Sequence, residues 1–495
     1  MQKSFFYNSE IRSVHIPKSV TSIGDEAFYR CYQLKSITIP DSVKEIGVEA
    51  FYDCNGLTSV VIPDSVMSIG KRAFLDCHGL RSITIPAHIT AISNGAFCDC
   101  SRLVSIKIPD SVTFIGKRAF RNCSALTSIT IPGSVETMGT DPFGWCEKLA
   151  KIRVDGKGEH FKIVDGVLFN KEMTRLIWYQ FMRSGSYEIP NTVETFDSEA
   201  FRENKNLTSI TIPESVTSIK GYSFEGCDAL TSITIPDSVT SICESAFSYC
   251  SALESISIPE TVTNIGKGAF KDCSALVSIT IPCSVTSLRS HVFAGCISLR
   301  SFKIPESVTH IGNGVFLGCT RLKSVVIPSS ATFLDNPFVE CTNLKMIDVF
   351  LNRKFVLVKG VLMDRGMTQV IYCRPSKNGR YAIPETVVSI LGRAFSYCSK
   401  LVSVTIPKSV TDIESYTFQH CESLKSVEIT SPVITIRAWA FHCCTKLASI
   451  NIPSPVATIE HDAFNGCSSL ETATLQKDIE CHPKAFPYRV WIKRH

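Results

Sequence analysis

The amino-acid sequence predicts a solenoid of roughly twenty stacked coils, each of 23 residues with parallel strands and a short helical turn, interrupted by two β-hairpin insertions. The first observation behind this fold class is a phenylalanine that returns every 23 residues. The second is the constant order of leucine, serine, isoleucine, proline and glycine between neighbouring phenylalanines. The third is a pair of longer intervals that resemble each other. The phenylalanines form three series: Phe5, Phe28, Phe51, Phe74, Phe97, Phe120 and Phe143; Phe201, Phe224, Phe247, Phe270, Phe293, Phe316 and Phe338; and Phe395, Phe418, Phe441, Phe464 and Phe486.

The first element expected in each coil is a short parallel strand. Residues 34–40, with the sequence LKSITIP, are typical. Their apolar positions Leu34, Ile37 and Ile39 have the spacing of the L-x-x-L-x-L pattern of leucine-rich repeats. Pro40 cannot donate a hydrogen bond to a strand ladder, so it ends the strand. Strands of this kind, one from each coil, would stack into a parallel sheet.

A second strand and a turn are expected in the rest of the coil. Residues 42–47, SVKEIG, carry β-branched side chains and then a glycine, which favours a second short strand followed by a turn. Residues 48–54, VEAFYDC, fit a single helical or 3₁₀ turn with Ala50, Phe51 and Cys54 pointing inward. Because one coil cannot bury its apolar side alone, the core has to form between stacked coils.

Two insertions interrupt the repeat. The intervals from Phe143 to Phe201 and from Phe338 to Phe395 are 58 and 57 residues long, so each holds one ordinary repeat and roughly 35 further residues. Each contains a GVL run followed by a second apolar run, which predicts a β-hairpin projecting from the stack. The insertions match each other at residues 165–169 and 359–363, 176–179 and 370–373, and 187–190 and 381–384. We therefore expect one continuous solenoid with repeat blocks at 1–143, 201–338 and 395–495, and a repeat plus insertion at 144–200 and 339–394.

Most of the 22 cysteines occupy one position of the repeat. A position that supplies one thiol per coil offers no complementary partner for a disulfide framework, so we expect free thiols that act as small buried apolar residues. This pattern fits a reducing compartment. The ladder cysteines are Cys31, Cys54, Cys77, Cys100, Cys123, Cys146, Cys227, Cys250, Cys273, Cys296, Cys319, Cys341, Cys398, Cys421, Cys444 and Cys467. Those expected to be reactive are Cys98, Cys243, Cys283, Cys373, Cys443 and Cys481.

No metal site, cofactor site or catalytic site is expected. The clusters of Cys98 with Cys100, and of His442 with Cys443 and Cys444, lack the two spaced ligand pairs of a zinc site, and each includes a ladder cysteine that faces the core. The sequence has no H-E-x-x-H, G-x-S-x-G or phosphate-binding G-x-x-x-x-G-K-S/T motif. We therefore predict a protein that is not an enzyme.

The charge and hydropathy patterns bear on partners and location. A net charge of +5, from 51 basic and 46 acidic residues spread along the chain, makes no nucleic-acid footprint. No apolar run reaches the length of a signal peptide or a membrane span. We therefore expect neither nucleic acid nor a membrane span among the interactions of this chain.

The exposed side of the first strands is the expected binding surface. Threonine recurs there at Thr38, Thr84, Thr130, Thr211, Thr234, Thr280 and Thr405, a ladder that β-propensity and cross-strand pairing explain without a function. Specificity is expected where other side chains break the ladder, at His15, Val61, Lys107, Arg153, Lys303, Val326, Glu428 and Asn451. Neighbouring charged positions complete this set: Arg81, Glu254, Arg300, Lys323 and Lys425.

Aromatic residues in the insertions form a second group of candidates. Trp178, Tyr179 and Phe181 in the first insertion and Tyr372 in the second are expected to be exposed anchors for a partner. The alternative is that these side chains only pack the hairpin onto the adjacent coil. The sequence leaves both interpretations open.

The whole repeat resembles one known family. The pattern F-x-x-C-x-x-L-x-S-I-x-I-P-x-S-V-x-x-I-G-x-x-A-F, found in residues 28–51 and throughout nearly the whole chain, is similar to the BspA-like leucine-rich-repeat proteins of oral and gut anaerobes and protozoan parasites. The resemblance implies a surface antigen or adhesin that binds matrix proteins or other microbes and has no enzyme activity in its repeats. We accordingly expect a non-catalytic cell-surface protein that binds a protein or glycan. An intracellular protein-interaction scaffold in the cytoplasm is the alternative, favoured by the free thiols and the missing signal peptide and anchor.

Overall fold

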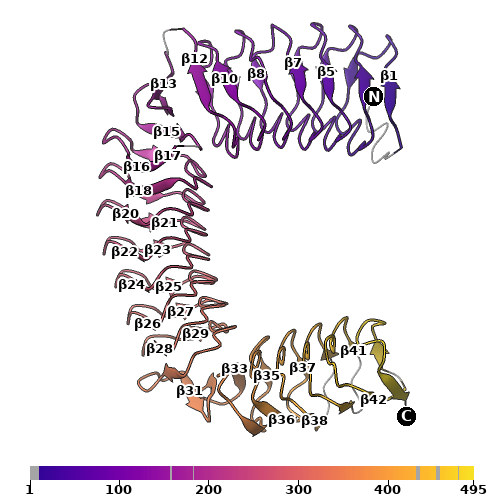
Figure 1. The fold of residues 1–495 in the computed structure, drawn as a ribbon, viewed down its shortest axis with the longest axis vertical. Coiled ribbons are helices and arrows are strands. Elements are labelled where there is room, and N and C mark those ends of the chain that lie inside the picture. Colours follow the sequence, from indigo (N-terminus) through magenta and orange to yellow (C-terminus); the bar gives the residue numbers. More distant parts are fainter. Residues whose placement is uncertain are drawn as a thin grey trace. The chain divides into compact units, whose positions relative to one another are not determined.

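The computed structural model describes residues 10–156, 159–181, 183–430, 435–452, 458–477 and 479–494. Phe5, the first member of the phenylalanine series, lies outside these residues. The chain divides into two compact units, Met1–Val239 and Thr240–His495, and each is a stack of coils in its own right. The predicted solenoid of parallel strands is confirmed in both units (Figure 1).

The first unit contains two series of short strands. In most coils the first strand is followed, after the I-P turn, by a second strand of two residues. The first series is β1 (Ser13–His15), β3 (Ser36–Thr38), β5 (Ser59–Val61), β7 (Ser82–Thr84), β10 (Ser128–Ile131), β12 (Lys151–Val154), β16 (Gly185–Glu188), β18 (Leu207–Thr211) and β20 (Ser232–Thr234). The second is β2 (Ser22–Ile23), β4 (Glu45–Ile46), β6 (Ser68–Ile69), β8 (Ala91–Ile92), β9 (Phe114–Ile115), β11 (Thr137–Met138), β17 (Thr195–Phe196) and β19 (Ser218–Ile219).

The second unit repeats this arrangement. Its first series is β22 (Ser255–Ile256), β24 (Ser278–Ile279), β26 (Ser301–Lys303), β28 (Ser324–Val326), β30 (Met346–Asp348), β34 (Gly379–Ala382), β36 (Leu401–Ile406), β38 (Ser426–Ile429), β40 (Ser449–Asn451), β42 (Thr472–Leu475) and β44 (Trp491–Arg494). Its second series is β21 (Ser241–Ile242), β23 (Asn264–Ile265), β25 (Ser287–Leu288), β27 (His310–Ile311), β29 (Phe333–Leu334), β35 (Ser389–Ile390), β37 (Asp412–Ile413), β39 (Thr435–Ile436), β41 (Thr458–Ile459) and β43 (Glu480–Cys481).

Strands pair with the equivalent strand of the next coil, in parallel and in register. Ile37 lies opposite Val14, and Val60 lies opposite Ile83, so inward positions stack on inward positions. The repeat serine adds a bond of its own: the Ser42 hydroxyl donates to the carbonyl oxygen of Val20, one coil earlier, at 2.7 Å. This hydrogen bond gives the S-V part of the motif its structural role.

The core lies between the coils, as the repeat predicts. Phe28 and Phe51 are fully buried, and their rings stack with centroids 5.1 Å apart at an interplanar angle of 4°. The same stacking continues along each unit, for example between Phe247 and Phe270 and between Phe441 and Phe464. Stacked rings of this kind contribute beyond the burial of their area.

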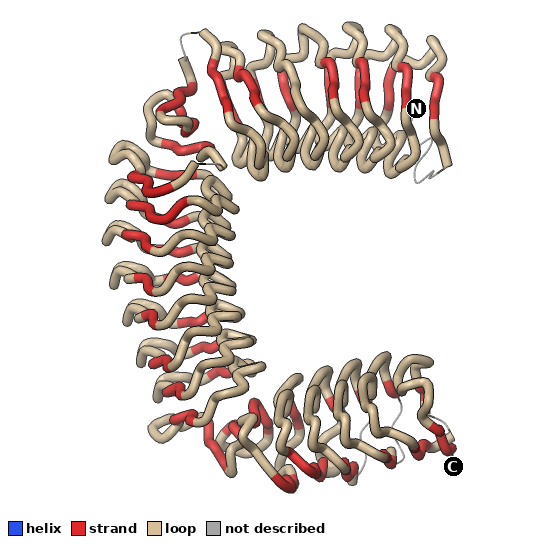
Figure 2. The backbone as a smooth tube through the Cα atoms, viewed as in Figure 1, coloured by secondary structure: helices blue, strands red, loops and turns tan. Residues whose placement is uncertain are grey.

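The expected helical turn is wrong: no residue of the described chain is in a helix (Figure 2). Glu49 and Asp53 have φ angles of 53° and 57°, so the backbone alternates between right-handed and left-handed conformations and cannot continue as a helix. The amides of Phe51 and Asp53 instead donate to the carbonyl oxygens of Ala73 and Leu75 in the next coil, at 2.8 and 2.7 Å. These bonds between coils offset a left-handed backbone that costs about 1–2 kcal/mol per residue. We call this segment of each coil the turn side.

The hairpin of the first insertion is confirmed, but its projection from the stack is wrong. Strand β14 (Val167–Asn170) pairs antiparallel with both β13 (Phe161–Val164) and β15 (Arg175–Trp178). Strand β15 then pairs in parallel with β17, so the insertion joins the sheet of the second strands. The apolar runs are buried because neighbouring coils cover them.

The second insertion has the same organisation within its own unit. Strand β32 (Val361–Asp364) pairs antiparallel with β31 (Phe355–Val358) and β33 (Gln369–Cys373). Strand β33 continues in parallel into β35. Each insertion is therefore a three-stranded extension of the solenoid wall.

Candidate binding surface

The exposed side of the first-strand sheet, which we call the strand face, is regular and polar in the first unit. His15 lies opposite Thr38, Val61 opposite Thr84, and Thr130 opposite Arg153. His15, Thr38, Val61, Thr84 and Arg153 are exposed, and Thr130 is half-buried. The breaks in the threonine ladder therefore occupy one row of the strand face.

Arg81 and Lys107, two further cations predicted on this part of the strand face, are exposed. The amide of Arg81 donates to Thr58 at 2.8 Å, and its carbonyl accepts from Val104 at 3.2 Å, which fixes its place in the row beside the threonines. Lys107 follows Thr84 by 23 residues and is also exposed. Both side chains are available to a partner, which leaves their binding role a prediction.

The strand face of the second unit carries a column of positive charge. The main-chain amide of Lys323 donates to the carbonyl oxygen of Arg300 at 2.8 Å, and that of Lys345 donates to the carbonyl oxygen of Lys323 at 3.0 Å. The three side chains therefore extend from the same position of neighbouring coils. Lys303 is exposed two positions beyond the serine of its strand, and it lies opposite Val326. None of these four cations forms an ion pair with another described residue within 4.0 Å. We call Arg300, Lys303, Lys323 and Lys345 the cationic column.

Lys345 is not among the positions predicted from the sequence, because one coil is a residue shorter than the others. The interval from Phe316 to Phe338 is 22 residues rather than 23, which moves Lys345 out of the expected register. The structure restores the alignment through the bond from Lys345 to Lys323.

A shallow hollow lies further along the strand face of the second unit. It has a volume of about 540 Å³ and is lined by residues of β34, β36 and β38, among them Arg380 and Glu428, and by Lys425 just before β38. The Thr405 hydroxyl donates to the Glu428 carboxylate at 3.0 Å. Lys425 and Glu428, predicted separately as specificity positions, therefore belong to one concave site.

The predicted exposure of the insertion aromatics is wrong for three of the four. Trp178, Tyr179 and Tyr372 are only 7%, 3% and 1% exposed, and Phe181 is half-buried. The centroid of the Tyr179 ring lies 4.9 Å from that of Phe201, and the Tyr372 hydroxyl donates to the main-chain carbonyl oxygen of Cys341 at 3.5 Å. These rings pack the insertion onto the adjacent coil, as in the alternative interpretation, because the insertion continues the wall of the solenoid.

The ladder cysteines are buried and free, as predicted. The structure adds a polar role: the Cys54 thiol donates to the carbonyl oxygen of Phe28, and the Cys77 thiol to that of Phe51, each at 3.1 Å. Burial raises the pKa of Cys77 to about 12, as it does for Cys146, Cys273 and Cys319. Two thiols expected to react, Cys98 and Cys373, are buried as well, which corrects that part of the prediction.

A buried charge cluster, which the sequence did not predict, joins the coils on either side of the first insertion. Glu199 accepts from Arg118 at 2.6 Å and from Arg121 at 3.2 Å, and Asp141 lies 3.2 Å from the same Arg121. Burial opposes ionisation of Glu199, but the charges of Arg121, Arg202 and Arg118 outweigh it and lower its pKa. Burial and the Glu199 carboxylate together raise the pKa of Asp141 to about 8. We interpret this cluster as a structural clasp.

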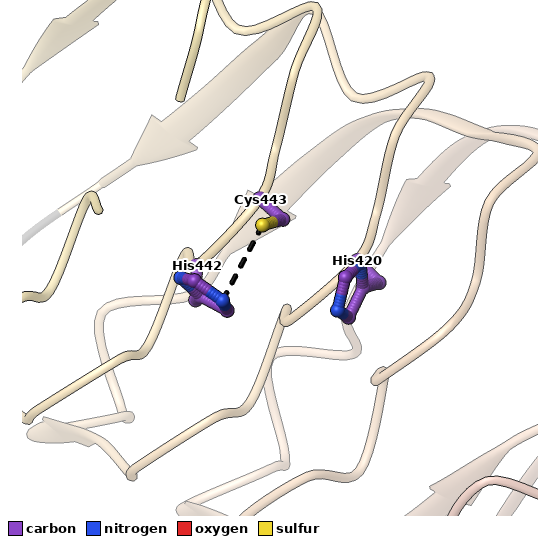
Figure 3. A group of neighbouring side chains, drawn as sticks. All are labelled: His420, His442 and Cys443. Atoms are coloured by element: carbon purple, nitrogen blue, oxygen red, sulfur yellow. Dashed lines mark hydrogen bonds between the residues drawn. The ribbon is translucent and has the colours of Figure 1, made fainter. Parts of the chain in front are cut away.

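One group with the composition of a metal site lies on the turn side of the second unit. His420, His442 and Cys443 have potential ligand atoms that all lie within 4.8 Å of one another (Figure 3). It is the one such group among the described residues. The cluster considered from the sequence contained His442, Cys443 and Cys444. It did not contain His420, which lies one coil earlier.

Comparison with known proteins decides the family. The profile described as "BspA type Leucine rich repeat region (6 copies)" matches residues 1–100, 44–172, 171–300, 240–355 and 373–490. The chain belongs to the BspA-type leucine-rich-repeat family. Within the described part of this BspA-type chain, no helix has the length and apolar character needed to span a membrane.

Three solved structures illustrate what this BspA-type chain is similar to. A leucine rich cell surface protein from Faecalibacterium prausnitzii is 35% identical, with a match over 70% of this chain and 81% of the other and a TM-score of 0.44. The pneumococcal vaccine antigen PcpA is 23% identical over 79% and 77% of the two chains, also with a TM-score of 0.44. A leucine-rich repeat protein from Bacteroides ovatus is 24% identical over 99% and 93%, with a TM-score of 0.32. No curated protein matches the chain.

Proposed function

We propose that this BspA-type chain is a non-catalytic adhesin or antigen of the cell surface, and that its strand face binds an anionic host or matrix protein or glycan. The observation that carries this proposal is the cationic column. Arg300, Lys323 and Lys345 present three positive charges on three successive coils, at a spacing of about 4.8 Å per coil. Cations without intramolecular partners raise the rate of encounter with an anionic ligand and favour it over neutral ones.

The form of the surface supports a large partner rather than a small molecule. The strand face presents its side chains in regular rows, one from each coil, and the hollow beside Lys425 and Glu428 has a volume of about 540 Å³. Small-molecule sites are concave and bury most of their ligand, whereas a flat row of regularly spaced side chains suits an extended polymer or a protein surface. The cell-surface assignment draws on the family and on the 35% identical leucine rich cell surface protein.

A binding panel tests the proposal. Purified full-length protein is applied to immobilised extracellular-matrix proteins, sulfated glycosaminoglycans and their desulfated counterparts, at low and at physiological ionic strength. We expect saturable binding to at least one anionic ligand, weaker binding to the desulfated form, and a loss of affinity as salt rises because exposed charges are screened. Absence of binding to every anionic ligand, or binding indifferent to both sulfation and salt, would contradict the proposal.

The intracellular scaffold is the second candidate, and the free thiols favour it. Intact cells that express the protein distinguish the two. Protease added outside the cells should remove a cell-surface adhesin and leave an intracellular marker untouched. Full protection of the protein in intact cells, with digestion only after lysis, would support the scaffold instead.

A further inference from the structure

The turn side of two neighbouring coils brings together two imidazoles and a thiol. His420 belongs to one coil, and His442 with Cys443 belongs to the next (Figure 3). The Cys443 sulfur lies 3.3 Å from Nε2 of His442. All three side chains are partly accessible, so solvent ions can reach them. This cluster is separate from the strand face, and the inference does not depend on the proposed function.

The backbone holds these side chains in place. His420 and Cys443 both have left-handed φ angles, of 55° and 57°, at the same position of successive coils. The amide of His420 donates to the carbonyl of His442 at 2.8 Å, and the amide of Cys443 donates to that of Asn465 at 2.9 Å. The His420 ring is also stacked on Tyr397, with centroids 4.8 Å apart. The solenoid therefore holds the three side chains next to one another on neighbouring coils before any ion binds.

The protonation pattern of His442 suits metal binding. Its Nδ1 lies 2.9 Å from the carbonyl oxygen of Asn465, and because a carbonyl oxygen can only accept, Nδ1 carries the proton. Nε2 then presents its lone pair towards Cys443. A ligand histidine held by its other nitrogen in this way is the usual arrangement in metalloproteins.

Gly466 leaves the space that the thiol occupies. It takes the position of Cys443 in the following coil, and a Cβ there would lie 2.7 Å from the Cys443 sulfur. Any larger residue would push the thiol out of line with His442. The glycine thus keeps the third ligand in the cluster.

The geometry points to a site for Zn²⁺, with His420, His442 and Cys443 as three ligands and a fourth position open to water or to a group from a partner. Imidazole and thiolate are ligands that Zn²⁺ prefers, and tetrahedral bonds of about 2.0 Å to nitrogen and 2.3 Å to sulfur place ligand atoms about 3.5 Å apart. The pair of His442 and Cys443 already has this separation, at 3.3 Å. His420 has to approach by roughly 1 Å, a movement within the reach of a side-chain rotation. On binding, the Cys443 thiol releases its proton to solvent and the sulfur forms the bond to the ion.

Metal titration of the full chain tests the site. The reduced protein, stripped with EDTA and dialysed, is titrated with Co²⁺ alone and then with Zn²⁺ against a chromophoric chelator. We expect one ion per chain, a sulfur-to-cobalt charge-transfer band with the strong visible bands of four-coordinate Co²⁺, and displacement of Co²⁺ by Zn²⁺. Cys443→Ser should abolish the charge-transfer band, and His442→Ala and His420→Ala should each weaken Zn²⁺ binding at least tenfold.

Matched controls separate this site from general thiol chemistry. Cys283→Ser removes an exposed thiol, and His310→Ala an exposed imidazole, elsewhere in the same unit; both should leave stoichiometry and affinity unchanged. Metal-free melting temperatures show whether each variant is folded, and Zn²⁺ should raise that of the wild type but not that of Cys443→Ser. Binding without a sulfur band, binding that survives both Cys443→Ser and His442→Ala, or no binding at all would overturn the proposal.

Discussion

The Cys54 thiol donates a hydrogen bond to the main-chain carbonyl oxygen of Phe28 in the preceding coil, at a distance of 3.1 Å. The bond recurs down both units, for example from Cys123 to Phe97 and from Cys444 to Phe418, each at 3.2 Å. Alanine at this position would lack the donor, and a larger apolar residue would not fit between the coils. The cysteine of the repeat is therefore a small buried side chain that also satisfies a carbonyl group.

Removing one such thiol should destabilise the solenoid. Cys123→Ala deletes the hydrogen bond and leaves a small void, so we expect the free energy of unfolding to fall by about 1–3 kcal/mol. Urea unfolding followed by circular dichroism measures this as a lower midpoint. Cys283→Ala, at an exposed cysteine, is the control and should leave the midpoint unchanged. Equal midpoints for Cys123→Ala and the wild type would show that the thiol contributes nothing.

The ladder thiols should not react in the native protein. Their raised pKa, about 12 for Cys77, leaves almost no thiolate at neutral pH, and burial blocks the reagent as well. An Ellman-type assay near neutral pH should modify exposed Cys283 first and half-buried Cys243, Cys443 and Cys481 more slowly. The ladder should react only in denaturant. Rapid modification of most of the 22 thiols without denaturant would contradict this account.

The clasp around Asp141 should make stability depend on pH. Its pKa is 3.8 ordinarily and about 8 when folded, so between these values the folded state binds the extra proton and stability falls as pH rises. Between roughly pH 5 and pH 8, we expect the free energy of unfolding of the wild type to fall by at least about 1 kcal/mol more than that of Asp141→Asn. Unfolding midpoints at both pH values measure the difference. Exposed Asp110→Asn should keep the wild-type slope, and the same slope in Asp141→Asn would disprove the assignment.

Gly144 should be required by the same clasp. A Cβ at this residue would lie 1.9 Å from Oδ1 of Asp141, so Gly144→Ala must displace the carboxylate from its arginines. We expect a loss of about 1–3 kcal/mol, measured by thermal or urea unfolding. Gly366→Ala is a matched control in a hairpin, where the nearest atom is the carboxylate end of Asp364 at 3.3 Å. Similar stabilities for the two variants would argue against the clasp.

The sequence predicts those features that repeat from coil to coil. The period, the inward phenylalanines, the cysteine ladder and the insertion hairpins all follow from spacing, because every coil repeats the same environment. The turn side differs from the predicted helical turn because the identities of residues such as Glu49 and Asp53 do not indicate a left-handed backbone. Burial of Trp178 could not be seen because the insertion interrupts the repeat that tells inside from outside.

Contacts between coils are the other features that the sequence did not reveal. Arg121 and Glu199 are 78 residues apart in the chain, and the insertion between them removes the common register. His420 and Cys443 occupy equivalent positions of successive coils, so they are too far apart in the sequence to form a short metal-binding motif. Lys345 lies in the cationic column because its amide bonds to the carbonyl oxygen of Lys323, an alignment that the shortened coil conceals in the sequence.

Charge reversal of the cationic column is the most direct test of binding through the strand face. The variant Arg300→Glu/Lys323→Glu/Lys345→Glu is compared with Lys267→Glu/Arg289→Glu/Lys408→Glu, whose exposed side chains lie off the strand face of the same unit. Each variant lowers the formal charge by six from +5, so a non-specific charge effect would be equal in both. With the anionic ligand identified by the panel, we predict at least tenfold weaker binding for the column variant and near wild-type binding for the control. Equal loss in both, or unchanged binding in the column variant, would contradict the account.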